Sequence, residues 1–213
     1  RVRENDPALR RAKTLLLMPD LLGYLLTGEK KSEYTNVTTT NLYSATAQNW
    51  DFDLVRKLGI PEGIFTSIDR AGTLRGRLLP SVATELGVSQ IPFAAVGTHD
   101  TASAVAAIPG EGNFAFCSSG TWSLFGIETS APLLGDSIYQ ANFSNEGTVQ
   151  GGFRPLKNIM GQWIMQECRR EWVKKGIQLS WKEIDGLTAK AEPFAAIIDP
   201  DDAPFFSAGD MCH

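Results

Sequence analysis

The sequence has few of the residues that hold a fold together through covalent bonds or metal ions. It contains three cysteines in 213 residues, and no two of them form a Cys-x-x-Cys pair. This odd, scattered set argues against a disulfide scaffold and a structural zinc site, and it favours a reducing compartment, the cytoplasm. No histidine, cysteine or carboxylate stands at metal-ligand spacing from His99, so we expect no protein-held metal there.

An excess of positive charge and long hydrophobic runs are also lacking. With 20 Lys and Arg against 24 Asp and Glu, the net charge is −4, which gives no basic surface for nucleic acid or an anionic membrane. The longest apolar stretch, residues 15–26, is interrupted by Pro19, Asp20 and Gly23 and is too short to span a bilayer. We therefore expect neither nucleic acid nor membrane as a partner.

The common signatures of hydrolases and nucleotide-binding loops are missing as well. Residues 135–139 do not form Gly-x-Ser-x-Gly, and residues 117–120 do not form a nucleophile elbow. The loop Ser118-Ser-Gly-Thr121 lacks the lysine of a Walker motif and does not match Gly-x-Gly-x-x-Gly. We expect no hydrolase chemistry from these segments.

What is present is an alternation of strand and helix patterns, which predicts an α/β fold. The predicted strands lie at residues 72–79, from Phe93, from Phe116, and at 123–128, 141–144 and 148–153, with a turn at 145–147. The predicted helices lie at residues 6–28 with a break at Pro19, at 51–58, 80–86, from Asp100, and at 156–175 and 181–191.

Two stretches combine features that phosphoryl transfer requires. Residues 93–105 are predicted to form a strand, a turn and a small-residue helix that begins near Asp100, and residues 116–123 form a strand that leads into a hydroxyl- and glycine-rich turn. A carboxylate can accept the proton of the attacking hydroxyl, while backbone N–H groups can hold phosphate oxygens. The simpler alternatives are an ordinary N-cap aspartate and an ordinary β-turn.

Polar side chains mark two further segments. Residues 32–48 are rich in hydroxyls, which predicts either a helix and loop packed on a sheet or a polar wall near a sugar. On the predicted helix 156–175, Asn158, Gln162 and Gln166 recur every four residues, so the α-carbons of Asn158 and Gln166 would lie about 12 Å apart. This face could span a sugar and a nucleotide, or it could simply be solvated.

At residues 97–105 and 118–123 the sequence resembles the FGGY carbohydrate kinases. Residues 18–28, 34–40, 142–147 and 156–169 resemble the branch of that family that phosphorylates L-rhamnulose, and the resemblance runs across essentially the whole chain. It implies two actin-like, ribonuclease H-like lobes with sugar and ATP in a cleft. Residues 1–107 would be the last part of the N-terminal, sugar-binding lobe and 108–213 the first part of the C-terminal, nucleotide-binding lobe, each incomplete.

The resemblance also implies the reaction and its residues. The reaction would be ATP-dependent phosphorylation of L-rhamnulose at O1, in rhamnose catabolism, with Mg²⁺ bridging the phosphates. Asp100 would be the catalytic base. The sugar would be contacted by His99, Asp100, Thr101 and Asn158, and ATP by Gly120, Thr121 and Gln166.

Two motifs of the family are absent from these residues: the N-terminal Asp-x-Gly-Thr/Ser phosphate loop and a later glycine-rich adenosine motif. Because phosphoryl-transfer catalysis depends mainly on positioning, we expect the 213 residues alone to be inactive or nearly so. The alternatives are a kinase for another ketose, such as L-fuculose or xylulose, and a non-catalytic actin-like binding module. The presence of Asp100 disfavours the binding module, and the oligomeric state stays open.

Overall fold

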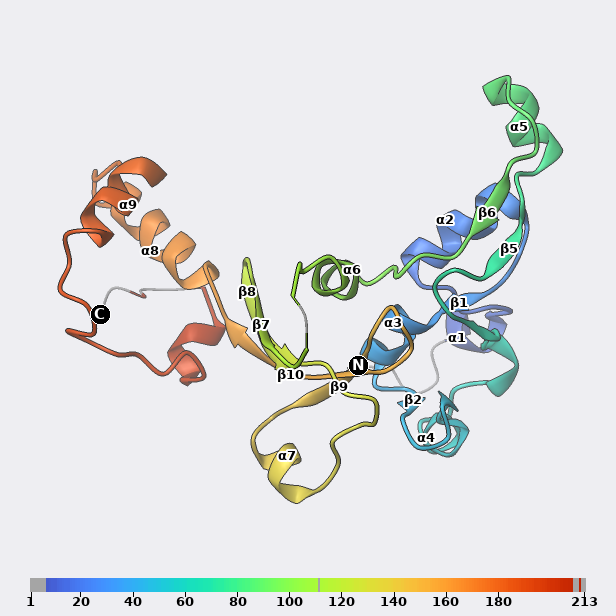
Figure 1. The fold of residues 1–213 in the computed structure, drawn as a ribbon, viewed down its shortest axis with the longest axis horizontal. Helices are drawn as coiled ribbons and strands as arrows, with labels where there is room; N and C mark the ends of the chain where they lie inside the picture. The colour runs from blue at the N-terminus through green and yellow to red at the C-terminus, as the bar shows by residue number, and fades with distance from the viewer. Residues whose placement is uncertain (1–6, 111, 209–210, 212–213) are drawn as a thin grey trace. The chain divides into compact units, whose positions relative to one another are not determined.

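The computed structural model describes residues 7–110, 112–208 and 211. The chain divides into two compact units. The helices and strands of both are labelled in Figure 1. Unit 1 contains the residues up to 115 together with 127–156, and unit 2 contains 116–126 together with the residues from 157 onward. Unit 1 therefore takes in a segment, 127–156, that follows the first strands of unit 2 in the sequence.

Unit 1 begins with two helices and a short parallel strand pair. The helix break falls at residues 12–17, before Pro19 and not at it, because a proline in the first turn removes no needed hydrogen bond. Gly28 ends the second helix in the left-handed conformation (φ 79°), as predicted, and its N–H bonds the Tyr24 carbonyl. The elements are α1 (Pro7–Arg11), α2 (Met18–Thr27), and β1 (Ser32–Glu33), which pairs with β4 (Ile68–Asp69).

The hydroxyl-rich segment folds into short helical turns. The hydroxyls of Thr38, Thr39 and Thr40 each donate to the carbonyl three residues earlier, so they tighten the local turn. Asp51 caps the predicted helix at 51–58 by accepting from the N–H of Leu54. The elements are α3 (Tyr34–Val37), η1 (Thr38–Thr40), β2 (Tyr43–Ser44) paired with β3 (Asn49–Trp50), α4 (Phe52–Lys57) and η2 (Glu62–Ile64).

The predicted strand and helices that lead to Asp100 are confirmed. Strands β5 (Leu74–Arg77) and β6 (Pro92–Ala94) are antiparallel and flank α5 (Pro80–Leu86). After β6 the chain turns and enters α6 (Asp100–Ala106). Asp100 therefore lies at the first residue of a helix, as its sequence context predicts.

The prediction for residues 141–153 is wrong except at Ser144 and Phe153. Strand β9 is Ser144–Gly147 and so covers the turn expected at 145–147, and a turn lies within 148–152, where a strand was expected. The physical reason is Gly151, whose φ of 91° suits a tight reversal and whose N–H bonds the Thr148 carbonyl. A short helix, α7 (Asp136–Gln140), was not predicted.

The prediction of a helix over 156–175 is wrong in its first third. Strand β10 (Phe153–Met160) occupies these residues and pairs antiparallel with β9, with Leu156 opposite Ser144. The helix α8 begins only at Trp163 and ends at Lys174. Apolar residues in a short run fit a strand and a helix equally well, and the pairing with β9 decides for the strand.

The remaining elements are one four-stranded sheet and the helices that follow it. Strands β7 (Ala115–Ser119), β8 (Trp122–Ile127), β10 and β9 follow one another in that order in the sheet, and the unit boundary crosses β10 after Leu156. Helix α9 (Trp181–Thr188) begins with a capping box between Ser180 and Glu183, and η3 is Ala203–Phe206.

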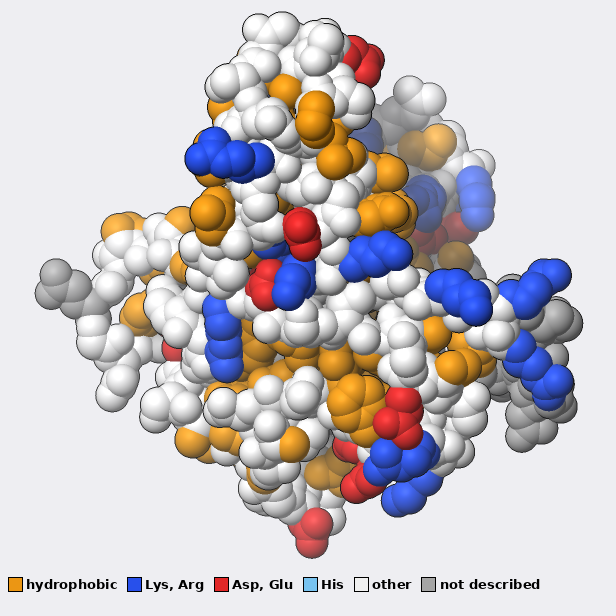
Figure 2. Space-filling view, turned by 90° about the vertical axis from the view of Figure 1, so that its right-hand side faces the viewer, with side chains coloured by type: hydrophobic (Ala, Val, Ile, Leu, Met, Phe, Trp, Pro, Cys, Tyr) orange, Lys and Arg blue, Asp and Glu red, His pale blue; other side chains and the backbone are white. Residues whose placement is uncertain are grey.

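The core of unit 1 combines apolar and charged side chains. In unit 1, Tyr34, Val37, Val55, Phe153 and Leu156 are at most 1% exposed, and charged residues lie buried among them. On the face drawn in Figure 2, hydrophobic side chains lie exposed between charged ones. Among the described residues, no helix is both long and apolar enough to cross a membrane.

Candidate active site

Asp100 presents an exposed carboxylate at the start of α6. Its side chain is 98% exposed, and its Oδ1 accepts the N–H of Thr101 at 2.7 Å. Thr101, Ala102 and Val105 bury the opposite face of the helix. The Nε2 atom of His99 lies 4.0 Å from Asp100 Oδ1. The carboxylate can therefore meet a substrate hydroxyl from solvent, with an imidazole nitrogen beside it.

Glu33 holds the loop that carries His99 and Asp100. Its Oε2 accepts the N–H of Thr98 at 3.0 Å, the Thr98 hydroxyl at 2.9 Å and the Thr35 hydroxyl at 2.5 Å. The Thr35 Oγ1 in turn accepts the N–H of His99 at 3.1 Å. Because Glu33 is fully buried, these bonds are shielded from water and fix the backbone immediately before Asp100.

A buried ion pair between Asp20 and Arg75 contacts the backbone of Glu33. Asp20 Oδ1 accepts from Arg75 Nη1 at 2.9 Å and from the N–H of Glu33 at 3.1 Å, and Asp69 Oδ2 accepts from Arg75 Nε at 3.2 Å. Burial raises the pKa of the Asp20 carboxyl, while Arg75 acts in the opposite direction. These bonds connect the charged side chains of α2, β4 and β5 to β1, the strand that contains Glu33.

Arg154 contacts the imidazole of His99 through its guanidinium group. Its side chain is fully buried, and its Nη2 lies 3.0 Å from His99 Nδ1 and 3.1 Å from Glu146 Oε2. Its Nε donates to the Gly147 carbonyl at 3.0 Å. Burial lowers the pKa of Arg154, whereas the carboxylates of Glu146, Glu128 and Asp100 act to raise it. The imidazole of His99 is thus held by a charged pair on the hairpin β9–β10.

The hairpin is fastened to α3 and η1. Tyr34 donates its hydroxyl proton to the Gly152 carbonyl at 2.8 Å, and the N–H of Gly147 donates to Thr38 Oγ1 at 2.8 Å. A β-carbon at Gly147 would lie 2.5 Å from the Tyr34 ring, so only glycine fits there. The hydroxyls of Thr35, Thr38, Thr39 and Thr40 bond protein groups, as expected of a packed segment, and the polar wall near a sugar stays a prediction.

Sequence reasoning missed Glu33, Glu146 and Arg154. Glu146 was assigned to a turn, and the partners of Glu33 and Arg154 at residues 98 and 99 are 65 and 55 residues away in the chain. One signal was available: Arg154 stands between Phe153 and Pro155-Leu156, so a charge interrupts an apolar run. Buried charges of this kind are expected to be paired.

In unit 2, the loop that contains Gly120 and Thr121 joins β7 to β8 and is exposed. Its carbonyls are held from the β10–α8 turn: Gly120 O accepts the N–H of Gln162 at 2.9 Å, and Thr121 O accepts the N–H of Gly161 at 3.2 Å. The N–H of Gly120 donates to the Trp122 carbonyl at 2.7 Å. The loop is therefore fixed by backbone contacts, and phosphate binding by it stays a prediction.

Asn158 and Gln166 do not share a helix face, so that prediction is wrong. Asn158 is exposed near the end of β10, whereas Gln166 lies in the first half of α8. Gly161 separates the two elements, and a β-carbon there would lie 2.7 Å from the Gly120 carbonyl oxygen. Because the chain passes this close to Gly120, it forms a turn at Gly161 between β10 and α8, where a continuous helix was expected. The roles of both residues toward sugar and ATP remain predictions.

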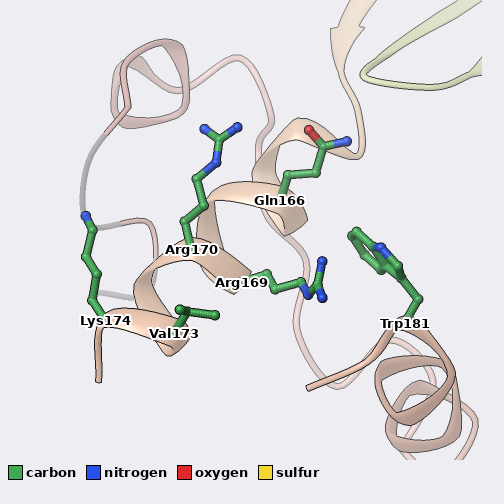
Figure 3. Close-up of a pocket in the computed structure, with 6 residues that line it drawn as sticks. All are labelled: Gln166, Arg169, Arg170, Val173, Lys174 and Trp181. Carbon is green, nitrogen blue, oxygen red and sulfur yellow. The ribbon is translucent and has the colours of Figure 1, made fainter. Parts of the chain in front are cut away.

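Gln166 lines a cavity of about 640 Å³ between α8 and α9 (Figure 3). Arg169 extends from α8 toward Trp181, its guanidinium carbon 5.0 Å from the ring centroid, and its Nε donates to the Leu179 carbonyl. A cationic and aromatic lining suits a flat, negatively charged ligand. The remaining residues that line the cavity are Arg170, Val173 and Lys174.

The candidate residues thus form two groups. His99, Asp100 and Thr101 lie together in unit 1, and Gly120, Thr121, Asn158 and Gln166 lie in unit 2. Within residues 7–110, 112–208 and 211, no three His, Cys, Asp or Glu side chains are arranged to hold a metal ion. Unit 1 therefore places the exposed carboxylate of Asp100 beside the largely buried imidazole of His99.

Comparisons with known proteins show the family. Residues 2–107 match the N-terminal domain, and residues 115–213 the C-terminal domain, of the FGGY family of carbohydrate kinases. A rhamnulokinase of Bacteroides thetaiotaomicron is 41% identical over 210 residues, which is 98% of this chain and 42% of that protein. A rhamnulokinase of Oceanobacillus iheyensis is 39% identical over 97% of this chain and 43% of that protein.

The fold comparison agrees. A ligand-bound xylulose kinase from Lactobacillus acidophilus superimposes with a TM-score of 0.73 at 12% identity, over 89% of this chain and 38% of that one. The predicted α/β, actin-like sugar kinase fold is thereby confirmed. The chain spans about four-tenths of the length of the curated relatives it matches. The chain belongs to the FGGY family of carbohydrate kinases.

Proposed function

We propose that the protein to which these residues belong transfers the γ-phosphoryl group of ATP to O1 of L-rhamnulose. The observation that carries the proposal is the exposed Asp100 carboxylate, held by Glu33 and Thr35 through the loop before it. Support for the substrate comes from relatives named rhamnulokinase, which match nearly all of the chain. The whole enzyme's activity is inferred, because the chain covers less than half of those relatives.

Asp100 acts as the general base in this proposal. The O1 hydroxyl gives its proton to a carboxylate oxygen of Asp100 as the O1–Pγ bond forms and the bond from Pγ to the ADP oxygen breaks. Proton transfer to a positioned side chain contributes typically 10²- to 10⁴-fold to the rate. An ionised carboxylate at a helix start, open to solvent, can accept this proton at neutral pH.

The other predicted residues divide between the two substrates. His99 and Asn158 would contact the sugar; Thr101 has a buried side chain and would act through its backbone or through small movements of α6. Gly120, Thr121 and Gln166 would contact ATP. Residues 1–107 and 108–213 would belong to the sugar-binding and nucleotide-binding lobes, in a cytoplasmic enzyme.

Mg²⁺ fits this residue set without a dedicated protein site. Mg²⁺ in kinases keeps several waters and is bound mainly through substrate phosphates and one or two carboxylates. When bound, the ion neutralises charge on the transferred phosphoryl group.

The test uses the longest reading frame that contains these residues. The purified protein is incubated with ATP, Mg²⁺ and a panel of L-rhamnulose, L-fuculose and D-xylulose, and sugar phosphates are detected by mass spectrometry beside an Asp100→Asn sample. We expect L-rhamnulose phosphate that is absent from the Asp100→Asn sample. If only another ketose gave product, the assignment of L-rhamnulose as the substrate would be overturned. If a folded protein gave no product with any sugar, the kinase proposal would be overturned. In the same assay we expect the 213-residue chain to give trace product at most.

A further inference from the structure

The roles of donor and acceptor in the contact between Arg154 and His99 depend on where the imidazole carries its proton. A guanidinium group has only N–H donors and no acceptor. Arg154 Nη2 lies 3.0 Å from His99 Nδ1, so a hydrogen bond between them requires Nδ1 to accept. An imidazole whose Nδ1 accepts is neutral and has its proton on Nε2.

Arg154 has little freedom to turn away from this contact. Its Nε donates to the Gly147 carbonyl, its Nη2 donates to Glu146 Oε2, and its side chain is fully buried. The two hydrogens of Nη2 can serve Glu146 and His99 at the same time, because each acceptor requires one. The hairpin that carries Glu146 and Arg154 is itself anchored to Tyr34 and Thr38.

Glu146 offers the competing arrangement. Its Oε2 lies 3.5 Å from His99 Nδ1, so an imidazole protonated at Nδ1 could donate to it. That proton would, however, face an N–H of Arg154 at the shorter distance of 3.0 Å, donor against donor. An imidazolium would in addition place a second positive charge against a buried guanidinium. The geometry favours the neutral tautomer.

We propose that Arg154, held in place by Glu146, is a positioning residue that keeps His99 neutral with its proton on Nε2. The Nε2 atom lies 4.0 Å from Asp100 Oδ1, so the site presents an N–H donor and a carboxylate acceptor side by side. Two neighbouring sugar oxygens match this pair: the reacting hydroxyl gives its proton to Asp100, and the adjacent oxygen accepts from Nε2–H. This last step rests on the proposed function, whereas the tautomer does not.

The first experiment reads the tautomer directly. The full-length protein is labelled with ¹⁵N-histidine, and long-range ¹H–¹⁵N correlation spectra are recorded near pH 7.5; the signals of His99 are those lost in His99→Gln. We expect an unprotonated Nδ1 and a protonated Nε2. A proton on Nδ1, or an imidazolium, would overturn the proposal whatever the enzyme's activity, so its failure is distinct from failure of the kinase assignment.

The second measurement tests whether Arg154 is responsible. In the double variant Arg154→Met/Glu146→Gln, which removes both buried charges together, we expect the single tautomer to be replaced by a mixture. The control is Arg77→Met, which removes an exposed arginine of unit 1 that donates to the Gln90 carbonyl and should leave the His99 signals unchanged. A folded double variant with the wild-type tautomer would show that Arg154 does not set it.

A kinetic pair extends the test to the substrate and needs no change at the buried arginine. The amide nitrogen of glutamine reaches the region of Nε2, whereas that of asparagine reaches the region of Nδ1. We expect His99→Gln to retain about tenfold more kcat/KM for the sugar than His99→Asn, with KM for ATP within twofold in both. The reverse order would contradict a donor at Nε2. If neither protein turns over any sugar, the spectra alone decide the tautomer.

Discussion

The two units hold their candidate residues by different physical means. Unit 1 buries five charged side chains, Asp20, Glu33, Arg75, Glu146 and Arg154, each at most 8% exposed, and their bonds lead to the loop that carries Asp100. In unit 2 the ion pairs reach solvent, as in Lys174–Glu171, where the lysine side chain is 71% exposed. There the loop at Gly120 is held by backbone contacts.

This difference corresponds to what each region must do in the proposed reaction. A base and an imidazole need their side chains oriented, and shielded charges orient strongly because the local dielectric is low. A phosphate loop needs a fixed backbone shape, for which close approach at glycine suffices. Buried charge in unit 1 therefore marks the part of the chain where a small displacement should cost most activity.

The largest effect on stability should come from the buried ion pair. Arg75→Ala leaves Asp20 buried without its main partner, and breaking a buried pair typically costs 3–5 kcal/mol. The matched change in unit 2, Lys174→Ala, removes an exposed ion pair and should cost less than about 1 kcal/mol. Urea denaturation followed by circular dichroism measures both, and equal losses would break the distinction between the units.

Glu33→Ala should have the next largest effect, on stability and on turnover together. It removes the acceptor of the buried Thr35 hydroxyl and of the half-buried Thr98 N–H and hydroxyl, and a buried donor left unsatisfied costs about 1–3 kcal/mol. We expect a loss of about 3 kcal/mol and at least a tenfold fall in kcat. Glu33→Gln, which retains an acceptor oxygen, should recover part of both, and exposed Glu85→Ala should change neither. Normal kcat in a folded Glu33→Ala protein would contradict the positioning role.

How far the sequence could predict these features depends on their range along the chain. The helix start at Asp100, the helix end at Gly28 and the short helix expected at 51–58 follow from neighbouring residues, and all three are confirmed. The contacts Glu33–Thr98 and Arg154–His99 join residues far apart, and no local pattern contains them. For the same reason β10 was taken for the start of a helix, because its strand character comes from pairing with β9.

A substitution at Gly161 tests the backbone contact between Gly161 and Gly120, and its effect on stability should be intermediate in size. A β-carbon at Gly161 would lie 2.7 Å from the Gly120 oxygen, so Gly161→Ala should cost about 1–3 kcal/mol through overpacking. The control is Gly186→Ala in α9, where a β-carbon meets no atom within 4 Å, and it should stabilise the protein by roughly 0.5–1 kcal/mol. Thermal denaturation of both variants gives the comparison, and a neutral Gly161→Ala would show that the loop is not held there.

The smallest effect should appear only at alkaline pH. Burial, with the charge of Tyr34, raises the pKa of Tyr43 to about 12. Below pH about 10 the hydroxyl is protonated in both states; above it the unfolded chain ionises first, so the free energy of unfolding should fall as pH rises from about 10 to about 12. Tyr43→Phe should weaken this fall, whereas Tyr139→Phe, at an 83% exposed position, should not. The free energies of unfolding of the wild type and of both variants, measured at pH 9 and pH 11, test this expectation.

The most direct test of the account compares two aspartates that each begin a short helix of unit 1. Asp100 begins α6 and Asp136 begins α7, so the change to asparagine is chemically the same at both. In the full-length protein we predict that Asp100→Asn lowers kcat for L-rhamnulose phosphorylation by at least 100-fold, with sugar affinity by calorimetry within threefold of wild type. Asp136→Asn should retain wild-type kcat. Equal kcat in the two variants would contradict the assignment of Asp100 as the base.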